Sequence, residues 1–200
     1  MSEHDVLNTT RLEAFSDGVL AVIITIMVLE LHMPEGRGWA DLMTLVPSFL
    51  VYILSFATTG VFWNNHHHVL RSAKRVTAGI MWANLHLLFW ISLVPFATAW
   101  VGHYHDSLWP AALYGIILIF SGLSFQILQR AIIADVGRNS DLAKALGSDL
   151  KGKISLFFYV VGVAIAFWHP TLSYFFYAAV ILAWALPDPR IEKQITSNNI

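Results

Sequence analysis

The chain has 200 residues, of which 56% are hydrophobic and 12% charged, with a mean hydropathy of +0.61 and a net charge of −1. About a quarter of the residues of a soluble domain are charged, so this composition predicts an integral membrane protein. Its expected surroundings are the lipid bilayer. Basic tracts are missing, which gives no reason to expect a nucleic-acid partner. The absence of cysteine excludes disulfides, thiolate metal sites and cysteine nucleophiles.

Six apolar segments qualify, or nearly qualify, as membrane spans, since a helix needs about 20 mostly apolar residues to cross the hydrocarbon core. They cover roughly 12–32, 43–68, 78–101, 109–130, 153–169 and 171–187. The last two are separated only by His169-Pro170-Thr171, which indicates a tight helical hairpin. The polar loop from Ala134 to Lys153 contains a pattern, from Ser140 to Gly147, that suggests a short surface helix. We therefore expect an all-α protein, with residues 1–200 forming a single six-span domain.

The basic residues predict the orientation in the membrane. With six spans, eleven of the twelve Lys and Arg residues fall on one side, and only Arg37 falls on the other. Basic residues concentrate in cytoplasmic loops, so both termini are expected in the cytoplasm.

The first apolar segment carries Ser16 and Asp17 near its start and Thr25 in its middle. A carboxylate in hydrocarbon is costly and needs a partner. On a helix, Asp17 lies about 140° from Val22, so Asp17 and Thr25 cannot face the same way. Two alternatives follow. Either Asp17 faces an aqueous path and Thr25 bonds to its own helix, or Thr25 faces the path and Asp17 faces neighbouring helices. The stripe that contains Thr25 comprises Phe15, Gly18, Val22, Thr25, Ile26 and Leu29.

Polar partners for Asp17 occur at matching depth in the second and third segments, and lipid cannot satisfy such groups. The expected network partners are Asn64, His66, His67, His68 and Asn84. Three consecutive histidines on a helix point about 100° apart and do not converge on one ion, so we expect no metal site. No phosphate loop or serine-nucleophile motif is present, so we expect no enzyme activity and no cofactor.

The run Arg11-Leu-Glu-Ala-Phe-Ser-Asp17 resembles the Arg-x-x-x-Phe-Ser-Asp signature of the prokaryotic transmembrane-protein-175 potassium channels. The stretches Trp63–His67 and Asn84–Pro95 also resemble the second and third spans of that family. The resemblance implies a six-span subunit of the cell membrane that assembles as a homotetramer. It further implies a central pore for K⁺ lined by the first helix, without a Thr-Val-Gly-Tyr-Gly filter, and this chain lacks that filter.

The resemblance also implies roles for individual residues of the first helix. Val22 would form the hydrophobic constriction, although the family more often has Ile or Leu there. Thr25 would form a threonine ring that selects the ion, and Ile26 and Leu29 would form further apolar rings. Arg11, Phe15, Ser16 and Asp17 would attach the helix to its neighbours. The expected function is a moderately K⁺-selective channel with a hydrophobic gate.

A second hypothesis uses the polar groups differently. Asp17 and the His66–His68 cluster could form a proton path or serve a proton-coupled transporter, because ionisable residues inside a membrane mark proton relays.

Overall fold

The computed structural model describes residues 3–147 and 149–185, and all regular secondary structure in these ranges is helical. Three long helices cover most of the length of the molecule: α1 (Glu3–Leu29), α3 (Val46–Arg71) and α6 (Leu108–Val136). The remaining helices are α2 (Trp39–Met43), α4 (Ala78–Ser92), α5 (Val94–His103), α7 (Asp141–Leu146), α8 (Leu150–Ala166) and α9 (Pro170–Ala185). Ser140 accepts the N–H of Ala143 and begins α7, which confirms the short helix expected in this loop.

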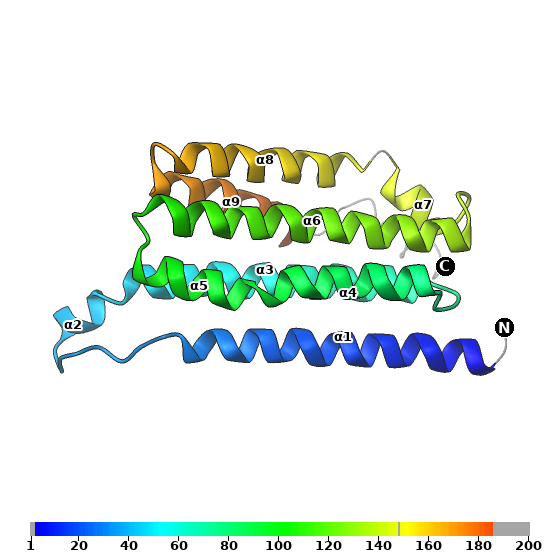
Figure 1. Ribbon diagram of the computed structural model, residues 1–200, viewed down its shortest axis with the longest axis horizontal. Coiled ribbons are helices and arrows are strands. Elements are labelled where there is room, and N and C mark those ends of the chain that lie inside the picture. Colours follow the sequence, from blue (N-terminus) through cyan, green and yellow to red (C-terminus); the bar gives the residue numbers. More distant parts are fainter. Residues whose placement is uncertain (1–2, 148, 186–200) are drawn as a thin grey trace, which may run out of the picture.

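The helices form an antiparallel bundle in which successive legs α1, α3, α4–α5, α6, α8 and α9 alternate in direction (Figure 1). Helix α6 lies in the middle, packed against α4, α5, α8 and α9. Helix α1 lies along one edge of the bundle and packs against α3, α4 and α5 (Figure 1). Because its contacts come from one direction, α1 has a face that this chain does not cover.

Four helical stretches are long and apolar enough to cross a membrane: Thr9–Leu29, Val46–Arg71, Ala78–His103 and Leu108–Val136. Helices α8 and α9 have 17 and 16 residues. At 1.5 Å per residue they are about 25 Å long, slightly shorter than a hydrocarbon core of about 30 Å. They occupy the expected fifth and sixth spans, except that residues 186 and 187 lie outside the described residues. The crossing of the membrane by all six legs stays a prediction.

The third predicted span is divided into α4 and α5 at Leu93. Pro95 has no N–H to donate to the carbonyl four residues earlier, which interrupts the helical hydrogen bonds at this point. Leu93 keeps a right-handed helical backbone, with φ −85° and ψ −10°. The result is an interruption within one continuous leg and not a loop.

Helices α6, α8 and α9 approach closely around the buried side chain of Tyr177. A Cβ atom at Gly115 would collide with the Tyr177 hydroxyl, and one at Gly162 would lie 2.5 Å from a Tyr177 ring carbon. The Tyr177 hydroxyl donates to the carbonyl of Ala111 at 3.1 Å. Glycine at these two positions therefore lets a large aromatic residue fill the space between three helices, on the side of α6 away from α1.

Candidate pore-lining helix and its attachment

Helix α1 has one buried stripe, whose residues recur every three or four positions as expected for a helix packed by one face. The stripe consists of Leu12, Ser16, Leu20, Ile23 and Met27, each at most 9% exposed. These side chains face α3, α4 and α5, the three helices against which α1 packs. The apolar packing of α1 against the rest of the chain therefore runs along this stripe.

The opposite face of α1 is exposed over the whole stripe expected from the sequence. Val22, Ile26 and Leu29 are 55%, 41% and 77% exposed, and Phe15, Gly18 and Thr25 are exposed as well. In a membrane protein, a row of apolar side chains with this exposure is expected to contact either lipid or another copy of the chain. We call this set the open stripe of α1.

Thr25 combines the two roles that the sequence left as alternatives. Its hydroxyl donates to the carbonyl of Val22 at 2.9 Å, while the side chain stays exposed on the open stripe. The bond uses the only hydrogen of the hydroxyl, so the remaining lone pairs of the oxygen stay available. An oxygen in this state can accept from water or coordinate a cation.

Ser16 joins a buried polar network that connects α1, α4 and α3. Its hydroxyl donates to the carbonyl of Leu12 at 2.8 Å and accepts from the Asn84 side-chain amide at 2.9 Å. The Asn84 oxygen lies 2.6 Å from Nε2 of His66, which must be the donor because this oxygen can only accept. All three side chains are at most 2% exposed. The network satisfies polar groups that would otherwise be costly to bury.

Asp17 is half-buried, and its carboxylate accepts from the indole N–H of Trp63 on α3 at 2.9 Å. It therefore faces a neighbouring helix and not the open stripe. Trp63 is not among the partners expected from the sequence. The available signal was chemical, since an indole N–H in a membrane helix needs an acceptor.

The other residues singled out from the sequence lie apart from this network. Asn64 and His68 are exposed and His67 is half-buried, and none of the three bonds to Asp17 among the described residues. Arg11 and Phe15, expected to attach α1, are exposed, and Phe15 lies on the open stripe. Among the described residues, no group of three or more His, Asp or Glu is arranged to hold a metal ion.

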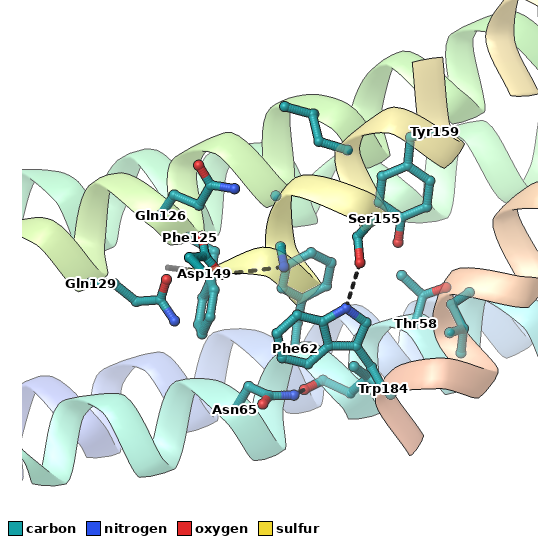
Figure 2. Close-up of a pocket in the computed structure, with 15 residues that line it drawn as sticks. Thr58, Phe62, Asn65, Phe125, Gln126, Gln129, Asp149, Ser155, Tyr159 and Trp184 are labelled. Atoms are coloured by element: carbon teal, nitrogen blue, oxygen red, sulfur yellow. Dashed lines mark hydrogen bonds between the residues drawn. The ribbon is translucent and has the colours of Figure 1, made fainter. Parts of the chain in front are cut away.

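A separate cavity lies between α3, α6, α8 and α9 (Figure 2). Its walls are mostly apolar, with Phe62, Phe125 and Trp184 prominent, and the amide of Gln129 also lines it (Figure 2). The indole N–H of Trp184 donates to Ser155 at 2.8 Å. Helix α1 contributes no residue to the lining, so this cavity is distinct from the open stripe.

The fold and the two faces of α1 define a class of protein: a helical membrane protein in which one edge helix keeps an uncovered face. Residues 11–95 match the sequence profile of the family described as "Endosomal/lysosomal potassium channel TMEM175". A potassium channel of Chryseobacterium sp. (strain P1-3) is 53% identical over 188 residues, which cover 94% of this chain and 98% of that protein. The chain belongs to the TMEM175 family, which confirms the resemblance seen in the sequence.

A solved structure supports the same assignment. The crystal structure of a lysosomal potassium-selective channel TMEM175 homolog from Chamaesiphon minutus matches with a TM-score of 0.77 at 28% identity, covering 88% of this chain and 96% of that one. A more distant relative, mouse TMEM175, is named an endosomal/lysosomal proton channel. It is 29% identical over 147 residues, which cover 65% of this chain and 30% of the mouse protein.

Proposed function

We propose that this chain is the subunit of a homotetrameric, moderately K⁺-selective channel of the cell membrane, with both termini in the cytoplasm and a pore lined by the open stripe of α1. The observation that carries the proposal is the division of α1 into a buried stripe and an exposed one. Relatives named as potassium channels support the choice of ion.

The position of α1 supports a pore between subunits. Helix α6 fills the middle of the bundle, which favours a passage for ions between copies of the chain over one through a single copy. Homo-oligomers close around a symmetry axis, and an edge helix with one uncovered face can meet its own copies there. Four open stripes around such an axis would cover one another and leave a narrow channel.

The residues of the open stripe suggest how such a pore would open. Rings of Val22, Ile26 and Leu29 make a narrow apolar passage from which water withdraws, and this blocks ions. Rotation of α1 would widen the passage and let water return. Thr25 oxygens, with their hydrogens held by the Val22 carbonyls, would then replace part of the hydration shell of the ion. K⁺ gives up its hydration shell at lower cost than Na⁺, so such a ring favours K⁺ moderately.

The second candidate is a proton path, and it is supported by the name of the mouse relative. The contacts of His66 weigh against its use as a relay. Its N–H donates to Asn84, the Asn84 amide donates to Ser16, and Ser16 donates to the backbone carbonyl of Leu12. An amide does not pass on a proton in the way that an imidazole does, and this chain of bonds ends at a carbonyl. We therefore assign the network to the attachment of α1.

Reconstitution tests the proposal. The purified chain should have the mass of four copies by native mass spectrometry, and vesicles that contain it should release K⁺ down a gradient faster than protein-free vesicles. A single-copy mass would contradict the pore between subunits. Proton flux without K⁺ flux would favour the second candidate.

A further inference from the structure

Two histidines meet at the end of the bundle where α1 finishes. His32 follows α1 in the chain, and His103 is the last residue of α5. Their ring centroids are 4.9 Å apart and the ring planes meet at 84°. Both side chains are exposed. The pair connects the end of the proposed pore helix with the end of one of the helices that hold it.

The hydrogen bonds of both rings fix where the ring hydrogens lie. Nδ1 of His32 lies 2.9 Å from the carbonyl oxygen of Glu30, and Nδ1 of His103 lies 3.0 Å from that of Ala99. A carbonyl oxygen only accepts, so Nδ1 carries the hydrogen in each ring. In the neutral rings, both Nε2 atoms therefore keep a lone pair. Metal-binding histidines are usually oriented by such a bond from their other nitrogen.

The surroundings of the pair suit a hydrated cation. Both histidines line a cavity of about 250 Å³ between the ends of α1 and α5 and the start of α3. Glu30, Thr44 and Ser48 also contribute to the lining. The cavity has room for several water molecules, and the negative charge of Glu30 raises the local concentration of cations.

We propose that His32 and His103 bind one divalent transition-metal ion of the Zn²⁺ class through their two Nε2 atoms, with water completing the coordination. Zn²⁺ binds imidazole nitrogen at about 2.0–2.1 Å, so two rings at a tetrahedral angle on one ion have centroids about 5 Å apart. The observed separation of the ring centroids, 4.9 Å, is close to this value. Among the described residues, no group of three or more His, Asp or Glu is arranged to hold a metal ion, so we expect an ion held by two protein ligands to exchange reversibly.

Binding would connect the end of α1 to α5. His32 lies three residues beyond Leu29, the last residue of α1. An ion shared with His103 would oppose rotation of α1 relative to α5. This consequence for conduction rests on the proposed function, whereas the metal site itself does not.

Calorimetry on the full chain without a polyhistidine tag tests the site directly, with Zn²⁺ as the probe and Mg²⁺ as the comparison. His32→Asn and His103→Asn are suitable variants, because the Asn amide can still donate to the backbone carbonyl while the Nε2 ligand is lost. Each should weaken Zn²⁺ binding on the order of 10-fold or more. Mg²⁺ should not bind at the pair, because it prefers oxygen ligands. His32→Ala and His103→Ala serve as second variants at these exposed positions.

His169→Asn is the matched control, since His169 is exposed and begins the turn into α9 at the same end of the bundle. It should bind Zn²⁺ as the native chain does. Unchanged affinity in both pair variants, or an equal loss in the control, would overturn the site. A second arm measures K⁺ release from vesicles with Zn²⁺ on both sides, which should slow in the native chain and not in His32→Asn. Lost binding without any effect on K⁺ release would overturn the link to α1 movement and leave both the site and the channel standing.

Discussion

Thr25→Ala is expected to bring the K⁺ over Na⁺ permeability ratio close to 1 while K⁺ still passes. The Thr25 hydroxyl lies on the open stripe and gives its hydrogen to Val22, so its oxygen is the polar ligand that the stripe offers to an ion. A tenfold permeability ratio corresponds to about 1.4 kcal/mol, which the partial replacement of one hydration shell can supply. Reversal potentials in opposed K⁺ and Na⁺ gradients measure the change.

Thr25→Ser is the matched control, because serine keeps the oxygen and its bond to the preceding turn of α1. It should keep most of the native permeability ratio. A proton relay through Asp17 and His66 would continue in Thr25→Ala, so proton flux measured in the same vesicles separates the two candidate functions. An unchanged reversal potential in Thr25→Ala would show that the ion is selected elsewhere.

Asn84→Leu is expected to reduce the stability of the folded chain by about 2–4 kcal/mol. The substitution removes the 2.6 Å bond to His66 and the 2.9 Å bond to Ser16 while keeping the number and branching of the side-chain heavy atoms. A buried donor left without a partner costs about 1–3 kcal/mol, and His66 would become such a donor. Ser16 would keep its bond to Leu12 and add less. Unfolding in detergent, followed by circular dichroism, measures the loss.

Asn64→Leu makes the same chemical change at an exposed position on α3 and should shift stability by less than about 0.5 kcal/mol. The variant Asn84→Leu should also retain the native permeability ratio wherever it still assembles, since Asn84 lies on the far side of α1 from the open stripe. Equal stability of the two variants would mean that the buried network does not hold α1 in place.

The two faces of α1 could be predicted from the sequence because they depend only on helical geometry. Every residue assigned to the stripe, from Phe15 to Leu29, is exposed in the structure. The detail of the attachment could not be predicted in the same way. Whether Ser16 or Asp17 contacts Asn84 depends on the rotation and depth of three helices relative to one another. A helical wheel of one segment gives neither the relative rotation nor the relative depth.

The contact between His32 and His103 was still harder to predict from the sequence. His32 and His103 are separated by 71 positions and belong to no common pattern, yet they meet because α1 and α5 end at the same level of the bundle. The break at Leu93 was accessible in principle from Pro95. The apolar run from 78 to 101 continues through the break without a change in composition, so hydropathy alone does not predict it.

The most direct test of the pore assignment uses the absence of cysteine from the native chain. Leu29→Cys places one thiol near the end of the open stripe, and Leu172→Cys places one on an exposed position of α9 at the same end of the bundle. A charged, water-soluble thiol reagent should block K⁺ current through Leu29→Cys and leave Leu172→Cys unaffected. Full current through Leu29→Cys after demonstrated modification of its thiol would contradict a pore lined by α1.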